Sequence, residues 1–331
     1  MADQPVREDH HSNVDSDDSD TFDDLFADPP DYYPPSPPPT TEKHALGRSG
    51  VQLTLHLVGH SVLEAHRLWN GSRVMADYLE EEQEQGRDLI RGKTVVELGA
   101  GAALPGIVCG LVLGARKVVV TDYPDPDLVD TMRKNIEEAE AGLASTAGSA
   151  ALQAAYAGPG TVVADGYIWG GDPLPLLKHL EGTENTPDET ASASEAQKYD
   201  VVLLADLLFR HAEHSKLAYS VAQTLKKTPE SRSYVFFTSY RPWLRHKDLA
   251  FFADACAAGL VVEHLLEKRL EKPPLFFEND PGDVSVRSTV SGYSLRWPVE
   301  GEDPASFWPP PGGIVGESDA AVTQEGATAT A

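Results

Sequence analysis

The chain has 331 residues, of which 41 % are hydrophobic, and its formal net charge at pH 7 is −25. Such a composition can bury a sizeable core, and the length suits one large α/β domain with tails or two small domains. A surface of this charge repels phosphate backbones, so it argues against unaided nucleic-acid binding and favours basic or cationic partners.

Membrane spans and cysteine chemistry are not expected either. The sequence contains no run of about 18 apolar residues, and no apolar segment follows Met1. The two cysteines, Cys109 and Cys256, lack the number and spacing of a disulfide framework or a zinc site. We therefore expect a soluble cytoplasmic protein in which both thiols are small buried side chains.

Three regions differ in composition. Residues 1–43 carry twelve acidic and two basic side chains and include the stretch "DPPDYYPPSPPPT". Charge and proline at this density predict an acidic, extended and disordered tail. Residues 44–298 show the periodic apolar patterns of a folded domain, and residues 299–331, rich in Pro, Gly and Ala, are predicted to form a flexible C-terminal tail.

The folded region begins with residues 51–69, whose alternating apolar and polar side chains predict paired strands, followed by a helical pattern over 70–86. Strands and helices then alternate, which predicts a seven-stranded, doubly wound, parallel sheet of Rossmann-like type. Two insertions, 141–160 and 181–197, interrupt the pattern. The predicted strands are 94–98, 117–121, 161–164, 199–205, 233–240, 260–268 and 292–299, and the helices between them are 104–113, 127–140, 214–227 and 247–258.

The stretch "TVVELGAGAALPGI" (94–107) places a glycine turn between the first strand and helix of this sheet, where ligands bind in such folds. A phosphate-binding loop requires a Lys after its last glycine, and none follows Gly106. The dinucleotide pattern Gly-x-Gly-x-x-Gly is met at Gly99 and Gly101, but Leu104 stands at the third glycine position. Both mismatches count against a phosphate-containing ligand.

S-adenosylmethionine suits this turn better. Glu97, at the end of the strand, could accept hydrogen bonds from the ammonium group of that ligand, whereas it would repel a phosphate. The sequence Gly99-Ala100-Gly101 lets the backbone approach a ligand closely. Asp122, at the end of the next strand, suits a carboxylate that binds both ribose hydroxyls, a feature that NAD shares.

Five ordered stretches resemble the seven-strand S-adenosylmethionine-dependent protein methyltransferases: "LWNGSRVMADYL", "VVELGAGAALPGI", "VVVTDYPDPDLVDTMRKNI", "ADGYIWG" and "YDVVLLADLLFRHAEH". Within that family they are most similar to the fungal protein N-terminal and lysine N-methyltransferases that act on translation elongation factor 1-alpha, earlier labelled nicotinamide N-methyltransferases. The resemblance implies S-adenosylmethionine as cofactor and no metal. It implies cofactor contacts from Trp69, Gly99, Ala100, Gly101, Asp122, Trp169 and Ala205, and Asn135 also fits the helix pattern of the family.

The resemblance also implies a protein substrate, the N-terminus of elongation factor 1-alpha. Asp206, after the fourth strand, is our candidate catalytic residue, as an acceptor that orients the incoming amine; the alternative is that it caps a helix. Relatives often have a Tyr three residues after this acid, and here Phe209 keeps the ring without the hydroxyl. No Asn-Pro-Pro-Tyr-type stretch follows the strand, which argues against a nucleic-acid base as substrate.

Other polar and aromatic residues lie near the predicted site. Tyr240, Arg241 and Trp243 follow the fifth strand and could form the rim of the pocket, where aromatic faces stabilise a methylated ammonium. His211 and His214 are interpreted as surface residues rather than metal ligands, because no further ligand stands nearby. A small-amine methyltransferase of nicotinamide type and a binding module without catalytic activity remain as alternative functions.

Overall fold

The computed structural model describes residues 37–145, 156–182, 198–271, 282–310 and 313. These residues lie in one compact unit that begins at Pro38. Most of the predicted N-terminal tail, half of the insertion 141–160, most of the insertion 181–197 and the chain after residue 313 lie outside the described residues. No helix in the described part of the chain combines the length and the apolar character needed to cross a membrane.

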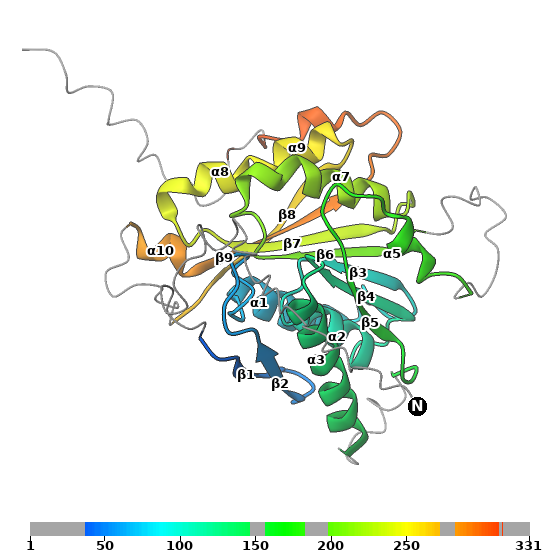
Figure 1. The fold of residues 1–331 in the computed structure, drawn as a ribbon. Coiled ribbons are helices and arrows are strands. Elements are labelled where there is room, and N and C mark those ends of the chain that lie inside the picture. Colours follow the sequence, from blue (N-terminus) through cyan, green and yellow to red (C-terminus); the bar gives the residue numbers. More distant parts are fainter. Residues whose placement is uncertain (1–36, 146–155, 183–197, 272–281, 311–312, 314–331) are drawn as a thin grey trace, which may run out of the picture. The chain divides into compact units, whose positions relative to one another are not determined.

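Seven strands form the central sheet in the order β5-β4-β3-β6-β7-β9-β8 (Figure 1). The five strands from β5 to β7 are parallel, as predicted. β9 is antiparallel to both of its neighbours, β7 and β8. The bounds are β3 Thr94–Leu98, β4 Lys117–Asp122, β5 Val162–Gly166, β6 Val201–Ala205, β7 Arg232–Thr238, β8 Val261–Arg269 and β9 Thr289–Arg296.

The prediction of a parallel sheet is therefore wrong for β9. β9 follows β8 in the sequence and pairs with it in the sheet. The single turn of α10 (Val284–Arg287) comes just before β9. An antiparallel neighbour needs no crossover helix, whereas a parallel one does. The absence of a helical pattern before residue 289 was the available signal. The resulting sheet has one antiparallel strand next to its edge strand.

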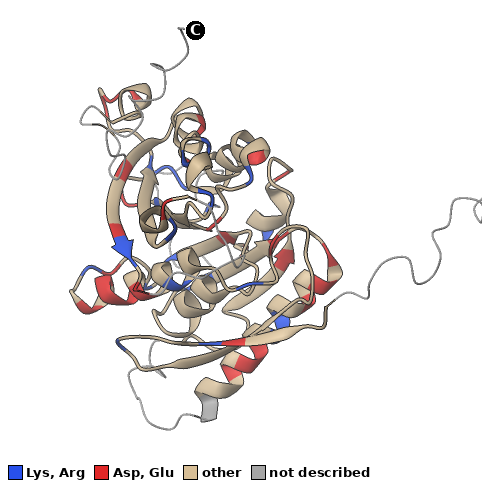
Figure 2. Cartoon of the chain, turned by 90° about the vertical axis from the view of Figure 1, so that its left-hand side faces the viewer, with Lys and Arg blue, Asp and Glu red and all other residues tan. Residues whose placement is uncertain are grey.

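Helices cover both faces of the sheet, with α1, α2 and α3 on one face and α7, α8 and α9 on the other (Figure 1). The helix predicted over 247–258 is two helices that meet at Ala250. Acidic and basic residues are interspersed along the described helices (Figure 2). The bounds are α1 Asn70–Glu84, α2 Leu104–Leu111, α3 Pro126–Ser145, α5 Leu174–Lys178, α7 His214–Thr224, α8 Arg245–Leu249 and α9 Phe251–Ala257.

Strand periodicity divides the core into two apolar layers. On β4, Val118 and Val120 pack beneath α1, α2 and α3, while Val119 between them packs on the opposite layer. On β7, Phe236 and Phe237 likewise face opposite layers. Side chains alternate between the faces of a strand, so strands covered on both faces are apolar at nearly every position. This explains the continuous apolar runs that predicted the strands.

An N-terminal hairpin packs beside α1 and α3. It consists of β1 (Thr40–Ala45) and β2 (Gln52–Leu57), so the first strand begins before the predicted domain boundary at residue 44. The buried Glu80 carboxylate of α1 accepts hydrogen bonds from the backbone N–H groups of Arg48 (2.8 Å) and Ser49 (2.7 Å) in the hairpin turn. The strand predicted to continue to residue 69 is wrong: β2 ends at Leu57, and residues 58–69, the entry loop, run to the start of α1.

At the other end, described structure continues past Pro298. Trp308 packs on Phe252 of α9, with ring centroids 4.8 Å apart, and on Tyr293 of β9 at 6.0 Å. A short helical turn at Pro304–Ser306 precedes it. The aromatic contacts fix this segment against the α9 side of the sheet.

Asn135 of α3 is fully buried and joins three segments. Its Oδ1 accepts the backbone N–H of His56 at 2.7 Å, and its Nδ2 donates to the carbonyls of His56 (3.0 Å) and Ala102 (3.1 Å). The amide thus completes the free edge of β2 and fixes the glycine turn after β3. Because buried backbone groups require partners, this one side chain stabilises the position of the hairpin and of the turn together.

Replacing Asn135 with Ala should remove the side-chain partner of three backbone groups, of which two are partly buried and one, the Ala102 carbonyl, is buried. We expect the free energy of unfolding to fall by about 3 kcal/mol, measured by urea denaturation. The matched control is Lys134→Ala, one position earlier on the exposed side of the same helix. A loss of less than about 1 kcal/mol for Asn135→Ala would contradict this account of the three hydrogen bonds.

Candidate active site

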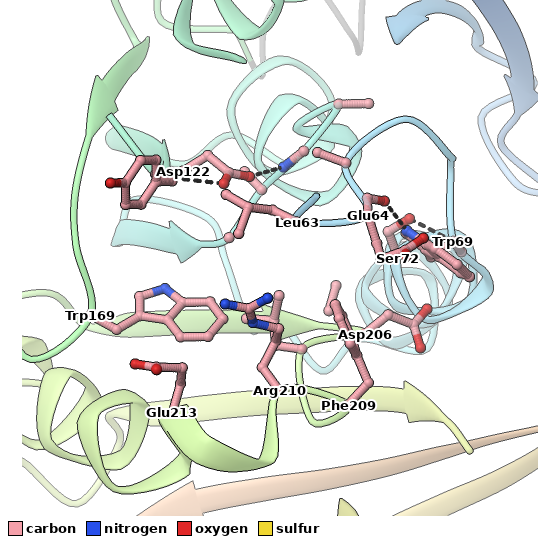
Figure 3. A pocket seen from close by; sticks show the side chains of 18 of the residues that line it. Leu63, Glu64, Trp69, Ser72, Asp122, Trp169, Asp206, Phe209, Arg210 and Glu213 are labelled. Atoms are coloured by element: carbon pink, nitrogen blue, oxygen red, sulfur yellow. Dashed lines mark hydrogen bonds between the residues drawn. The ribbon is translucent and has the colours of Figure 1, made fainter. Parts of the chain in front are cut away.

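A cavity of about 310 Å³ lies at the carboxyl ends of β3, β4, β5 and β6 (Figure 3). Its walls come from the entry loop and the start of α1, the glycine turn, the segments after β4 and β5, and the segment from Ala205 to Lys216. The eight residues predicted from the sequence all line it: Trp69, Gly99, Ala100, Gly101, Asp122, Trp169, Ala205 and Asp206. Parallel strand ends meet at one edge of a sheet, and this brings the distant motifs together.

The structure adds lining residues that the sequence reasoning missed. The largest group belongs to the entry loop and includes Leu63, Glu64 and Leu68. This loop was interpreted as a strand because its apolar residues alternate with polar ones. The residues Gly59 and Ser61, both turn formers, were the available signal for a loop.

The glycine turn contains three residues with left-handed backbone angles, namely Gly99 (φ 64°), Gly101 (φ 53°) and Ala103 (φ 62°). Two of the three are glycine, which adopts this conformation without strain. A Cβ on Gly99 would lie 2.6 Å from Leu207 and 2.9 Å from Trp169, so protein side chains occupy that side. A Cβ on Gly101 would meet no atom within 4 Å, so Gly101 is the glycine that leaves room in the cavity.

Three N–H groups of this turn are already bound within the protein. Ala100 N donates to Thr121 O (2.8 Å), Gly101 N to Asp122 Oδ2 (2.7 Å) and Ala103 N to Ala100 O (2.7 Å). A pyrophosphate site needs such N–H groups directed at the ligand. Leu104, at the third glycine position, is also fully buried against the core. The geometry thus agrees with the sequence argument against a dinucleotide.

Asp122 ends β4 and faces the cavity (Figure 3). Its Oδ2 accepts from Gly101 N and its Oδ1 from Tyr123 N, both at 2.7 Å. Burial raises the pKa of this carboxyl above its ordinary value, and the two N–H groups oppose that shift. Each oxygen keeps a further lone pair, so the side chain could still accept hydrogen bonds from a pair of ribose hydroxyls.

Glu97 differs from its predicted role. It is 1 % exposed and does not line the cavity; its Oε2 accepts the N–H of Gly106 at 2.8 Å, beneath the first turn of α2. Burial raises the pKa of Glu97 to about 8. Direct contact with the ammonium of a ligand is therefore not supported, because the strand turns this side chain toward α2 and away from the cavity. Its effect is to stabilise the strand–helix joint.

Asp206 ends β6 in a left-handed conformation (φ 54°) and lines the cavity. Its Oδ1 accepts the N–H of Thr238 at 2.7 Å, and its Oδ2 accepts the N–H of Gly71 at the start of α1. The side chain therefore caps α1, a distant helix, rather than the helix that follows it in sequence. Burial raises the pKa of Asp206 to about 7, opposed by these two hydrogen bonds.

Aromatic side chains surround Asp206. Trp69 packs on Tyr240 with ring centroids 5.0 Å apart, and the indole N–H of Trp69 donates to Glu64 O at 2.8 Å. Arg241 donates to the carbonyl of Phe209 at 3.4 Å. Trp243 is 51 % exposed and does not line the cavity. Tyr240 and Arg241 thus support the wall from behind, whereas the prediction placed them on the rim.

The two histidines near the site have structural partners. His214 is buried and its Nε2 donates to Leu208 O at 2.7 Å, which corrects the prediction of a surface residue. His211 Nε2 lies 2.7 Å from Asp248 Oδ1. Among the described residues, no three His, Cys, Asp or Glu side chains form a group that could hold a metal ion.

The cavity fits S-adenosylmethionine in its polar and apolar parts. Asp122 supplies acceptors at one end, Gly101 leaves the adjoining space free, and the rings of Trp169 and Trp69 provide apolar walls (Figure 3). Ligand sites commonly combine such apolar walls with a few directed polar groups. The same residues would bind the nucleoside and the sulfonium-bearing chain of the cofactor.

Gly101→Ala tests the open position in the turn. An alanine at positive φ should lower the free energy of unfolding by about 1 kcal/mol, and its methyl group would occupy space in the cavity. We expect the dissociation constant for S-adenosylmethionine, measured by calorimetry, to rise at least tenfold. The matched control is Gly92→Ala, which has φ 70° and open space but lies outside the cavity. Equal dissociation constants for both variants would exclude Gly101 from the binding site.

The raised pKa of Asp206 predicts that the free energy of unfolding depends on pH. Its pKa is about 7 in the folded chain against an ordinary value of 3.8. The folded state therefore binds this proton more tightly than the unfolded state, and its contribution to stability decreases as pH rises from about 4 to about 7. Asp206→Asn should flatten this decrease in urea denaturation at pH 4.5, 5.5 and 7. Asp130→Asn, an exposed carboxylate on α3, controls for the loss of a charge. An unchanged slope for Asp206→Asn would contradict the prediction.

The chain is similar to known methyltransferases. Residues 52–156 match a family model described as lysine methyltransferase. A protein N-terminal and lysine N-methyltransferase of Neurospora crassa is 51 % identical over 282 residues, which cover 85 % of this chain and 90 % of that protein. Proteins of the same description are 46 % identical in Gibberella zeae (84 % and 96 % covered) and 40 % identical in Emericella nidulans (86 % and 99 % covered).

The chain therefore belongs to the family of S-adenosylmethionine-dependent protein N-terminal and lysine N-methyltransferases.

Proposed function

We propose that this enzyme methylates the N-terminal α-amine and a nearby lysine of translation elongation factor 1-alpha in the cytoplasm. The names of the relatives support a protein N-terminus and a lysine as acceptors. The five sequence stretches quoted above support the elongation factor as the substrate. The observation that carries the proposal is the cavity itself, in which Asp122, the open Gly101 position and Asp206 line one space at the strand ends.

In this proposal the cofactor supplies a methyl group on positively charged sulfur. Asp122 would bind the ribose, Trp169 would pack near the adenine, and Trp69, Gly101 and the backbone of Ala205 would line the rest of the cofactor. The protein then has to align the acceptor amine and exclude water, since the methyl donor is intrinsically reactive.

The acceptor must be neutral, and this requirement separates the two amines. An α-amine with a pKa near 8 needs about 1 kcal/mol to lose its proton at pH 7, whereas a lysine near 10.4 needs about 4 to 5 kcal/mol. A site that only aligns its acceptor would therefore methylate the α-amine first. Methylation of lysine requires additional help from burial or from a base.

Asp206 is the residue that we infer to orient the amine. It lines the cavity, and each of its oxygens accepts one backbone N–H, which leaves further lone pairs for an incoming N–H. With a pKa of about 7, its carboxyl could accept a proton near neutral pH. The same hydrogen bonds hold its position relative to α1 and β7.

Incubation of the purified chain with labelled S-adenosylmethionine and elongation factor 1-alpha tests the proposal. We expect label in the N-terminal peptide, identified by mass spectrometry. A substrate with an acetylated N-terminus should retain only the label on lysine. Asp122→Ala should lose cofactor binding and activity together.

An unmodified N-terminal peptide would overturn the substrate assignment. In that case, labelling of a cell extract before and after dialysis distinguishes a small-amine substrate from another protein. If the chain fails to bind S-adenosylmethionine in calorimetry, the methyltransferase mechanism itself fails.

A further inference from the structure

Arg210 points into the cavity from the segment that follows β6 (Figure 3). It precedes the short helical turn His211–Glu213 and is partly buried. Neighbouring residues fix the backbone around it: His214 donates to the carbonyl of Leu208 at 2.7 Å and Arg241 to that of Phe209 at 3.4 Å. These hydrogen bonds therefore hold in place the backbone segment that carries the Arg210 side chain.

The acids of the cavity have partners other than Arg210. Glu213 forms an ion pair with Lys216 at 2.9 Å, and Glu64 lies 3.9 Å from His66. Both Asp122 and Asp206 accept backbone N–H groups. Within the described residues, no hydrogen bond or ion pair reaches the Arg210 guanidinium, although four carboxylates line the same space.

Burial of a charge is costly without a counter-ion, so a partly buried guanidinium that lines a cavity is suited to an anionic ligand. Guanidinium matches a carboxylate with two parallel N–H···O bonds, which a lysine ammonium does not reproduce. From this geometry we propose that Arg210 binds a carboxylate when the cavity is filled. The inference rests on the proposed function, since the ligands considered are those of a methyltransferase that modifies protein amines.

Two ligands could bring this carboxylate. The amino-acid end of S-adenosylmethionine carries one, and an acidic side chain close to the acceptor amine would be another. Both present the same chemistry to the guanidinium, and separate measurements of cofactor binding and of substrate KM distinguish them.

The first measurement is calorimetry of wild type and Arg210→Met with S-adenosylmethionine and with its decarboxylated form, which keeps the amine and the sulfonium. If the cofactor supplies the carboxylate, the dissociation constant for S-adenosylmethionine rises at least tenfold in Arg210→Met. The constant for the decarboxylated form then changes less than twofold. Arg210→Lys keeps the positive charge but cannot donate two parallel hydrogen bonds, so it should give an intermediate rise in the dissociation constant for S-adenosylmethionine.

The second measurement is KM for N-terminal peptides with a free α-amine that differ only in carrying Glu or Gln at one position among the second to fifth residues. If the substrate supplies the carboxylate, Arg210→Met raises KM at least tenfold for one Glu peptide. The matching Gln peptide already shows the high KM with wild type. Cofactor affinity is then unchanged in the variant.

Lys134→Met is the control, because it removes one positive charge from an exposed position that does not line the cavity. We expect changes below threefold in both measurements. Thermal unfolding by circular dichroism verifies that Arg210→Met is folded. Changes below twofold in both arms for Arg210→Met would overturn the inference, whereas failure of wild type to bind the cofactor would overturn the proposed function instead.

Discussion

Buried side-chain oxygens that accept backbone N–H groups from other elements determine the shape of the active site. Asp122 connects β4 to the glycine turn, and Asp206 connects β6 to β7 and to the start of α1. Asn135 connects the same turn to the N-terminal hairpin. Each bond satisfies a backbone group that burial would otherwise leave unpaired. The walls of the cavity are therefore coupled, although they come from segments far apart in the sequence.

Backbone strain is concentrated around the same cavity. The non-glycine residues with positive φ in the described chain are Glu64, Ala103 and Asp206, and each lies in a segment that forms its wall. Such conformations cost of order 1 kcal/mol or more and persist where surrounding contacts enforce them. The bond from Trp69 to Glu64 O and the bonds of Asp206 provide that enforcement. These strained conformations therefore reduce the stability of the fold, and they lie in the segments that place polar groups at the cavity.

The charge of the cavity differs from that of the whole chain. The chain has a net charge of −25, yet three cations, Arg67, Arg210 and Lys216, line the cavity beside four acids. A nearby positive charge disfavours a protonated amine and a nearby carboxylate favours it, so the two kinds of side chain have opposite effects on the ionisation of an amine in the cavity. The overall charge of the chain predicted an attraction to basic partners. The charged side chains that line the cavity act instead on the pKa of an amine bound there.

The sequence by itself determined the seven strands of the central sheet, the order of the motifs and eight residues that line the cavity, because buried strands are continuous apolar runs and ligand-binding turns follow their ends. It did not determine the direction of β9, the entry loop, or the orientation of Glu97 and Asn135. The direction of a strand depends on how the chain returns to the sheet. The contacts of Glu97 and Asn135 depend on which elements pack against them, here α2 for one and β2 for the other. Spacing along the chain contains no information on these partners, so only the tertiary structure decided them.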